Sequence, residues 1–378
     1  MNAPVYLDYN ATTPVAPEVA IAMQACLTGV FGNPSSAHDR GRQAAAVIGD
    51  ARHSVAELIG ARSDEIVFTG SATEANNLAL LGVARALRAV RRHLVISAIE
   101  HPAVMEPALH LQREGWELTI VPVDGHGRVA PAIVAAAVRP DTALVSIMHA
   151  NNEIGTLQPI AEIAALTRAR GVLLHTDAAQ SVGKVPVDVT SLGVDLLTLA
   201  GHKFYAPKGI GALYVRTGTR IENILFGASQ EHGLRPGTEN VPAIAGLGAA
   251  AQLAGQRLPE AGPHLRELRD ALDHRLRDAI PGLSLNGHPV ERLPNTLHLS
   301  FPKVSGRELL KLASRDVEAS VGSACHSEGD AVSGVLAAMG LNAARAMGAV
   351  RLSTGRMTTL AEIERAANAL ITAWRRLA

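Results

Sequence analysis

The sequence predicts an α/β protein with a large, mostly parallel sheet of seven strands, followed by a smaller α+β domain. Apolar runs rich in Val, Ile and Leu alternate with longer amphipathic stretches, as in proteins whose strands are joined by helices. The runs are apolar almost throughout, which is typical of parallel strands covered on both faces. After about residue 240 the pattern changes to longer helices and short strands, which indicates a second domain.

The individual elements follow from the period of the apolar residues. The seven expected strands lie at residues 65–69, 93–99, 118–123, 142–150, 171–179, 194–202 and 211–215. Helical spacing is found between them at 74–91, 103–114 and 160–171. In the C-terminal part we expect helices over 239–255, 264–280 and 360–377, and a strand over 296–301. We assign residues 15–255 to the large domain, and residues 1–14 together with 256–378 to the small domain.

Composition excludes several classes of protein. The 35 Lys and Arg residues balance the 35 Asp and Glu residues, so direct binding of nucleic acid, which needs a basic patch, is not expected. No apolar run approaches the roughly 18 residues that cross a membrane, and the N-terminus lacks the regions of a secretion signal. Two cysteines, Cys26 and Cys325, are too few for a disulfide framework or a Cys-based zinc site. We therefore expect a cytoplasmic protein with reduced thiols and no bound metal.

Polar side chains gather where the predicted strands end, which is where ligands bind in open α/β sheets. Four strand ends carry them: Glu100 and His101; His149, Asn151, Asn152 and Glu153; His175, Asp177 and Gln180; and His202 and Lys203. A lysine that follows an apolar strand loses solvation, which favours its neutral amine and so its reaction with an aldehyde. Pyridoxal phosphate needs such a lysine and a carboxylate for its pyridine nitrogen, and Lys203 and Asp177 supply both.

Residues 70–74, "GSATE", lie between a predicted strand and a predicted helix, and a helix N-terminus at this place favours a phosphate group. Each feature also has a simpler interpretation. Lys203 can be a solvated lysine, Asp177 a helix cap, "GSATE" a capping box, and the strand-end histidines ordinary core residues. One ligand, pyridoxal phosphate, accounts for the lysine, the carboxylate and the anion site together, and we prefer it for that reason.

The two cysteines have different settings in the sequence. Cys26 lies on the apolar face of a predicted helix, which indicates a core residue. Cys325 lies among Gly, Ser and charged residues in "EASVGSACHSEGD", which is a poor setting for a core residue and leaves a nucleophile as the alternative. A thiol of ordinary pKa is only slightly ionised at neutral pH, so we expect a proton acceptor near Cys325, either His326 or His101.

Ten segments resemble, in the same order, those of the cysteine desulfurases, which are fold-type I, class V aminotransferase-like enzymes that use pyridoxal phosphate. They are "YLDYNATTPV", "FGNPSSAHDRGR", "EIVFTGSATEANNLAL", "EHPAVMEP", "MHANNEIGTLQPI", "HTDAAQSVGKVPVDV", "GHKFYAPKGIGALYV", "RPGTENV", "GSACHS" and "RLSTGRMTT". The resemblance covers nearly the whole chain. It implies the fold-type I architecture and a homodimer whose subunits share the active sites.

The resemblance also implies which residues bind the cofactor. Lys203 corresponds to the lysine that forms a Schiff base with pyridoxal phosphate, and Asp177 to the partner of the pyridine nitrogen. Gln180 corresponds to the donor to the phenolic oxygen, and His101 to the histidine that stacks on the ring and moves protons. The residues that correspond to phosphate ligands are Thr73, His202 and, from the neighbouring subunit, Thr238.

The substrate implied by the resemblance is L-cysteine, which is converted to L-alanine. Asn152 and Arg351 correspond to the residues that bind its carboxylate, a task for which the planar guanidinium is suited. Cys325 corresponds to the nucleophile that receives the sulfur as a persulfide and passes it to an acceptor protein. The acceptor pathway stays open, since iron–sulfur assembly, tRNA thiolation and DNA phosphorothioation all draw on a persulfide.

Two departures from the family pattern concern the phosphate site. Ala200 precedes the Gly-His-Lys segment where family members commonly have Ser, so one phosphate hydrogen bond, on the order of 1 kcal/mol, is expected to be missing. Gly70 and Ser71 stand where many members have Ser-Gly, so this loop is expected to differ locally.

Four other functions would account for part of this pattern of residues. Selenocysteine lyase shares the scaffold, and "SACHS" and "RPGTEN" also resemble that enzyme and the desulfurase of DNA phosphorothioation. A plain aminotransferase would use the same lysine. A metal-dependent hydrolase would use the strand-end histidines, and His149 and Glu153 lie four residues apart, but no H-E-x-x-H segment exists. A non-catalytic cofactor-binding protein would not account for the presence of Cys325 and Arg351.

Overall fold

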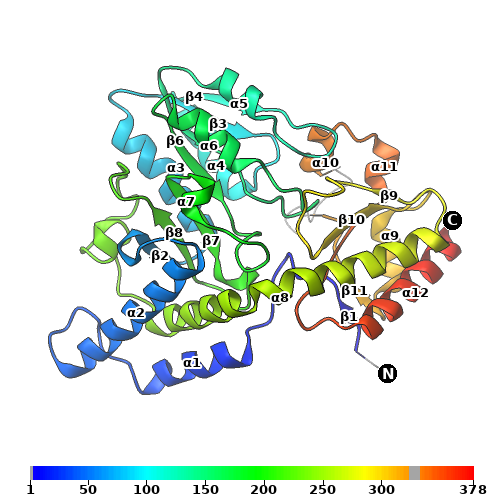
Figure 1. Ribbon diagram of the computed structural model, residues 1–378, viewed down its shortest axis with the longest axis horizontal. Helices are drawn as coiled ribbons and strands as arrows, with labels where there is room; N and C mark the ends of the chain where they lie inside the picture. Colours follow the sequence, from blue (N-terminus) through cyan, green and yellow to red (C-terminus); the bar gives the residue numbers. More distant parts are fainter. Residues whose placement is uncertain (1–2, 323–332) are drawn as a thin grey trace.

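The computed structural model describes residues 3–322 and 333–378. Its larger part is built on a seven-stranded sheet in the order β2-β8-β7-β6-β5-β3-β4 (Figure 1). The strands are β2 (Ile66–Thr69), β3 (His93–Ser97), β4 (Glu117–Val121), β5 (Thr142–Ser146), β6 (Leu173–Asp177), β7 (Leu196–Ala200) and β8 (Gly211–Val215). β8 runs opposite to the other six strands of this sheet, so its pairings with β2 and β7 are antiparallel and the remaining pairings are parallel. The predicted α/β fold with a mostly parallel seven-stranded sheet is confirmed, with one strand in each apolar run.

Helices cover both faces of this sheet, because successive strand residues point to opposite sides. Ile66 and Phe68 belong to one apolar cluster and Val67 to another. The cluster around Val67 includes residues of α3 (Ala72–Leu87) and α4 (Pro102–Arg113). The helices that contribute to the opposite cluster are α1 (Pro17–Thr28), α2 (Asp39–Leu58), α5 (Pro131–Ala137), α6 (Ile160–Arg168), α7 (Val189–Leu192) and the first part of α8 (Val241–Ala279). The strand ends are therefore the accessible edges of the sheet.

Three short 3₁₀ helices complete the larger part: η1 (Ser63–Glu65), η2 (Gly201–Lys203) and η3 (Glu231–Gly233). The smaller part contains an antiparallel sheet of β9 (Ser284–Leu285), β10 (Thr296–Ser300) and β12 (Ala349–Ser353), and a parallel pair of β1 (Val5–Tyr6) with β11 (Val317–Glu318). Its helices are α9 (Gly306–Ala313), α10 (Gly334–Ala338), α11 (Ala343–Met347) and α12 (Leu360–Leu377). A third apolar cluster joins β1, β10, β12, α9 and α12. The N-terminal strand thus packs with the C-terminal part of the chain.

One long helix, α8 (Val241–Ala279), runs from the larger part to the smaller part (Figure 1). The sequence predicts two separate helices here, but a single helix continues through Pro259 and Pro263. Each proline removes a main-chain donor, which normally ends or bends a helix. Packing at both ends outweighs that cost, since residues up to 251 lie in one core and residues from 265 in another. The predicted domain boundary after residue 255 falls inside α8 and stays a prediction.

None of the helices within residues 3–322 and 333–378, α8 included, is long and apolar enough to cross a membrane.

Close packing of α8 on α2 gives a test of this arrangement. A Cβ atom at Gly248 would lie 2.6 Å from both Cα and Cβ of Ala51, whereas a Cβ at Gly262 would have no neighbour within 4 Å. We expect Gly248→Ala to lower the free energy of unfolding by about 1–3 kcal/mol because the two helices must separate. Gly262→Ala, the control in the same helix, should raise it by about 0.5–1 kcal/mol because alanine favours the helix. Equilibrium unfolding in urea measures both; a neutral Gly248→Ala would contradict the packing described.

Candidate active site

One cavity of about 260 Å³ lies at the carboxyl ends of β6 and β7. Eight of the ten predicted site residues line it: Thr73, His101, Asn152, Asp177, Gln180, His202, Lys203 and Arg351. They come from α3, the N-cap of α4, the end of β6, the segments that follow β5, β6 and β7, and β12 of the smaller part. The cavity therefore depends on both parts of the fold.

Lys203 reaches the cavity because η2 begins directly after β7. Its Nζ donates hydrogen bonds to the carbonyl oxygens of Asn10 and Ala11, both at 2.7 Å. The Asn10 carbonyl also accepts a hydrogen bond from Gln180 Nε2 at 2.9 Å. The N-terminal segment thus holds the two predicted cofactor ligands side by side.

A second lysine, Lys184, is buried behind this pair. Its Nζ donates to Gln180 Oε1 at 2.8 Å and to Asn10 Oδ1 at 3.2 Å. Burial, together with the charges of Lys203 and Arg351, holds the pKa of Lys184 well below its usual value. Because Lys184 donates to the amide oxygen of Gln180, the amide nitrogen faces the Asn10 carbonyl.

Asp177 is the last residue of β6, and both of its carboxylate oxygens are fixed. Oδ2 accepts a hydrogen bond from Asn76 Nδ2 at 2.7 Å, and Oδ1 accepts one from the backbone N–H of Ala179 at 2.9 Å. The hydrogen bond from the N–H of Ala179 resembles that of a helix cap, which was the simpler interpretation of Asp177. Asp177 nevertheless also lines the cavity, and the residue is only 6% exposed.

The four strand-end histidines divide into two pairs. His175 contacts Ser146 Oγ at 2.8 Å and Thr198 Oγ1 at 3.1 Å, and His149 contacts Ser181 Oγ at 2.9 Å. Burial lowers the pKa of each of these two rings to about 4, so both are neutral core residues near pH 7. The simpler interpretation is right for this pair.

The other pair, His101 and His202, lines the cavity. His101 Nδ1 accepts a hydrogen bond from the N–H of Ala103 at 3.1 Å, so the neutral ring carries its proton on Nε2. Burial lowers the pKa of His101; Asp177 opposes this shift and Lys203 adds to it. Burial, followed by the charge of Lys203, also lowers the pKa of His202 to about 4. Both rings are therefore neutral near pH 7.

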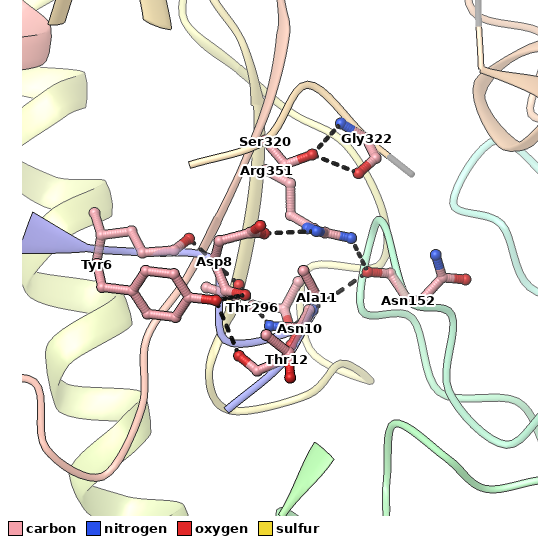
Figure 2. Close-up of polar contacts among 12 residues, drawn as sticks. Tyr6, Asp8, Asn10, Ala11, Thr12, Asn152, Thr296, Ser320, Gly322 and Arg351 are labelled. Carbon is pink, nitrogen blue, oxygen red and sulfur yellow. Dashed lines mark hydrogen bonds and ion pairs between the residues drawn. The ribbon is translucent and has the colours of Figure 1, made fainter. Parts of the chain in front are cut away.

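Arg351 lies on β12 and is held from two sides, as Figure 2 shows. Nη2 pairs with Asp8 Oδ1 at 2.7 Å, and Nη1 donates to the carbonyl oxygen of Asn152 at 2.9 Å. The residue is only 2% exposed, and its Nε has no hydrogen-bond partner within the described part of the chain. A buried donor without a partner is costly, so this edge of the guanidinium is suited to an anionic ligand.

The predicted phosphate site is the N-terminus of α3. Ser71 caps this 16-residue helix by accepting a hydrogen bond from the N–H of Glu74 at 3.1 Å. Glu74 Oε2 in turn accepts from the N–H of Gly70 at 2.8 Å. Ser71, Ala72 and Thr73 line the cavity, so capping and a position suited to an anion occur together.

These groups fit pyridoxal phosphate. A lysine amine, a fixed carboxylate and a helix N-terminus surround one cavity, and they match the aldehyde, the pyridine nitrogen and the phosphate of the cofactor. Two buried polar atoms at the cavity walls, Asn76 Oδ1 and Arg351 Nε, lack a hydrogen-bond partner among residues 3–322 and 333–378. A polar ligand in the cavity would be able to satisfy them.

Two predicted residues are not in the cavity. Thr238 is exposed and does not line it. Cys325 lies outside the described residues. Cys26 is buried in the core, as expected, and burial raises the pKa of its thiol.

Sequence reasoning missed four residues that hold the site together: Asp8, Asn10, Asn76 and Lys184. Asp8 and Asn10 belong to the quoted segment "YLDYNATTPV", which was the available signal. Asn76 lies 101 residues before its partner Asp177, and only the fold brings the two together.

The strand-end histidines and Glu153 are the residues that a metal-dependent hydrolase would use as ligands. Within residues 3–322 and 333–378, no three His, Cys, Asp or Glu side chains are grouped to hold a metal ion. His149 contacts Ser181, and Glu153 accepts a hydrogen bond from Ser333.

Glu100, beside His101, is a fully buried carboxyl group whose ionisation can be tested. Burial raises its pKa from 4.5 to about 8, even though Ser97 and the N–H of Met148 donate to Oε1. Between these two pH values the folded state binds a proton that the unfolded state has lost. The free energy of unfolding must therefore fall as the pH rises through this window.

The variant Glu100→Gln retains an oxygen acceptor but does not titrate. We expect the free energy of unfolding of the wild type, relative to this variant, to fall between pH 5 and pH 8 by on the order of 1 kcal/mol per pH unit. Urea unfolding at several pH values measures the difference. Parallel curves would mean that Glu100 is ionised in the folded protein.

Ala200 ends β7 and lines the cavity, so the missing hydroxyl noted in the sequence can be restored there. We expect Ala200→Ser to tighten the binding of pyridoxal phosphate about fivefold, which corresponds to one added hydrogen bond of about 1 kcal/mol. Titration of the cofactor-depleted protein, followed by visible absorption, gives the Kd. An unchanged or larger Kd would show that residue 200 does not reach the phosphate.

Comparisons with known proteins agree with this geometry. The family described as "Aminotransferase class-V" matches residues 5–366. A cysteine desulfurase IscS from Dictyoglomus turgidum is 47% identical over 360 residues, which cover 95% of this chain and 91% of that protein. A solved NifS-like protein superposes with a TM-score of 0.93 at 36% identity, covering 99% of this chain and 100% of that chain.

A further solved structure, of SspA in complex with cysteine, has a TM-score of 0.82 at 37% identity and covers 92% of this chain and 98% of that chain. The similarity extends over both parts of the fold, and the lengths of the matched chains are nearly the same. The protein belongs to the class-V aminotransferase family and, within it, to the cysteine desulfurases.

Proposed function

We propose that the protein is a pyridoxal phosphate-dependent cysteine desulfurase, which converts L-cysteine to L-alanine and leaves the sulfur on Cys325 as a persulfide. The observation that carries this proposal is the convergence of Lys203, Asp177 and Arg351 on one cavity. These residues lie on three separate elements and supply an amine, a carboxylate and a guanidinium. A simple anion-binding or structural site has no use for this combination.

The cavity residues have distinct tasks toward the cofactor. When bound, pyridoxal phosphate supplies an electron sink that makes the α-hydrogen of the amino acid acidic. Lys203 would bind the aldehyde of the cofactor, Asp177 would keep a proton on its pyridine nitrogen, and Gln180 would donate to its phenolic oxygen. His101 would lie against the ring, and Thr73, His202 and the N-terminus of α3 would hold the phosphate.

The substrate side of the cavity contains Asn152 and Arg351, which bind the carboxylate of L-cysteine. Lys203 Nζ takes the α-proton, and the thiolate of Cys325 attacks the substrate sulfur. The C–S bond of the substrate then breaks as the S–S bond forms, and its electron pair stays with the β-carbon, which takes up a proton. The α-carbon then regains the proton that Lys203 removed. Cysteine and one protein thiol thus give alanine and one persulfide, so no external oxidant or reductant is needed.

The persulfide is passed on to an acceptor protein in a reducing cytoplasm, and the active unit is a homodimer. Thr238 supports the dimer, because it is exposed and does not line the cavity of its own chain, as expected of a residue that serves the phosphate of the neighbouring subunit.

A single turnover of the purified, cofactor-loaded protein with L-cysteine tests the proposal. We expect one equivalent of alanine and a Cys325 peptide heavier by one sulfur atom, detected by mass spectrometry. Lys203→Ala should lose both products because it removes the amine. Cys325→Ala should lose the persulfide and the turnover of cysteine.

Other results would overturn the assignment. Alanine from selenocysteine but not from cysteine, with Cys325 unmodified, would identify a selenocysteine lyase. Amino transfer to a keto acid without release of sulfur would identify an aminotransferase. Retained turnover in Lys203→Ala would contradict the whole set of roles.

A further inference from the structure

A second lysine, Lys184, lies close to the lysine that is proposed to bind the cofactor. It is only 6% exposed, and it lines a second cavity, of about 470 Å³, which Lys203 lines as well. Lys184 does not line the active-site cavity, and the steps proposed above do not use it. Burial of an amine is costly unless the amine is well bonded, so the contacts of Lys184 call for an explanation.

Lys184 reaches the amide of Gln180 because the chain turns twice after β6. The N–H of Ser181 donates to the carbonyl oxygen of Ala178 at 3.0 Å, and the N–H of Lys184 donates to that of Ser181 at 3.0 Å. These turns bring Lys184 to the same side of the chain as Gln180, four residues before it. Lys184 Nζ donates to Gln180 Oε1 at 2.8 Å.

The neighbours of Gln180 fix the orientation of its amide. The main-chain carbonyl of Asn10 can only accept, so the group 2.9 Å from it must be Nε2 of Gln180. The amide oxygen then faces Lys184, which donates to it. An amide nitrogen has two N–H groups. Asn10 takes one of them, so the other can donate to a ligand in the active-site cavity that Gln180 lines.

Lys184 also holds the side chain of Asn10. Its Nζ donates to Asn10 Oδ1 at 3.2 Å, and the same oxygen accepts from Asn295 Nδ2 at 3.0 Å. The main-chain carbonyl of Asn10 accepts from Lys203 as well as from Gln180. Lys184 therefore contacts two residues that contact each other, and one of them also binds Lys203.

The hydrogen bonds of Lys184 match those of a neutral amine. Burial lowers its pKa well below the usual value, and the charges of Lys203 and Arg351 add to this shift. A neutral amine has two N–H groups, and the amide oxygens of Gln180 and Asn10 are two acceptors. Lys184 is thus suited to act through hydrogen bonds rather than through a charge.

Other titratable groups surround the two lysines. The side chains that line the second cavity with them are Tyr9, Tyr205, Arg257, Glu260, His264 and Arg356. Those that line the active-site cavity with Lys203 are His101, Asp177, His202 and Arg351. Both of these histidines have lowered pKa values, so they are neutral near pH 7 and do not titrate above it.

We propose that Lys184 is a positioning residue, which holds the Gln180 amide in the orientation that lets its N–H donate to the phenolic oxygen of pyridoxal phosphate. The inference rests on the proposed function, because it assumes the role given there to Gln180. Lys184 acts through Gln180 and Asn10 rather than on the substrate.

This role sets the proton affinity of the nitrogen through which Lys203 is joined to the cofactor. The phenolic oxygen has its largest negative charge when that nitrogen has lost its proton. A donor to the oxygen therefore favours loss of the proton and lowers the pKa of the nitrogen. Without Lys184 the Gln180 amide is free to turn and its donation weakens, so this pKa must rise.

A pH titration of the visible absorption of the cofactor-loaded protein tests the inference, because loss of this proton changes the spectrum. For Lys184→Met, which keeps a long side chain but removes its donors, we expect the midpoint to rise by about 0.7 pH unit. This shift is about fivefold in proton affinity and corresponds to one hydrogen bond. Lys184→Arg keeps the donors and has a fixed positive charge, so its midpoint should be unchanged or lower.

Two further variants separate positioning from other effects. Lys208→Met removes an exposed lysine whose charge acts on His202, and solvent screens that charge. Its midpoint should stay within about 0.2 pH unit of the wild type. Gln180→Met should raise the midpoint by itself. Addition of Lys184→Met to Gln180→Met should then raise it little further, because both changes remove the same donation.

The failure of this inference differs from the failure of the proposed function. If Lys203→Ala gives the same spectrum as the wild type, the role of Lys203 is wrong and the inference falls with it. If the wild type has a spectrum that depends on Lys203 and Lys184→Met titrates at the same midpoint, only the inference is overturned.

Other results would also overturn the inference. An equal rise in Lys208→Met would show a general effect of charge, and an undiminished rise in the Gln180→Met background would show that Lys184 does not act through Gln180. Where Lys184→Met does not fold, Lys184→Arg decides. An unchanged or lower midpoint in Lys184→Arg would support the inference, and a raised midpoint would overturn it.

Discussion

The site depends on one constraint: the short N-terminal segment after β1 passes between the two parts of the fold and meets the reactive groups of both. Its carbonyl oxygens at Asn10 and Ala11 accept the hydrogen bonds of Lys203, and its Asp8 pairs with Arg351. The Asn10 side chain donates to Thr296 Oγ1 on β10 at 2.8 Å and is buried. Lys203 belongs to the larger part and Arg351 to the smaller part. Their relative position is therefore set by a few consecutive residues.

The larger sheet was largely predictable because six of its seven strands are buried along nearly their whole length, while the edge strand β4 is partly exposed. Each apolar run between residues 65 and 215 corresponds to one strand, since burial on both faces leaves no polar alternation to obscure the pattern. The strands β1, β9 and β11 were not predictable, because an alternation of apolar and polar residues cannot be recognised in two residues. The continuity of α8 was not predictable either, since local propensity opposes Pro259 and Pro263 and only tertiary contacts explain the helix.

The site was predictable where its chemistry lies in side chains at strand ends. Lys203 and Asp177 could be found because an apolar strand precedes each of them, and the resemblance added Arg351. The supporting contacts could not be found in this way. Lys203 binds main-chain carbonyls, which any residue supplies, and Asn76 approaches Asp177 only through the packing of α3 on the sheet. The sequence thus reveals reactive groups more readily than the groups that orient them.

The length of α8 has a thermodynamic consequence. At 1.5 Å per residue its 39 residues extend about 58 Å, and its two ends are buried in different apolar cores. Unfolding of either core would expose the apolar face of the shared helix and so remove contacts from the other core. The free energies of the two cores are coupled through this helix, and cooperative unfolding extends over the whole chain rather than over each core separately.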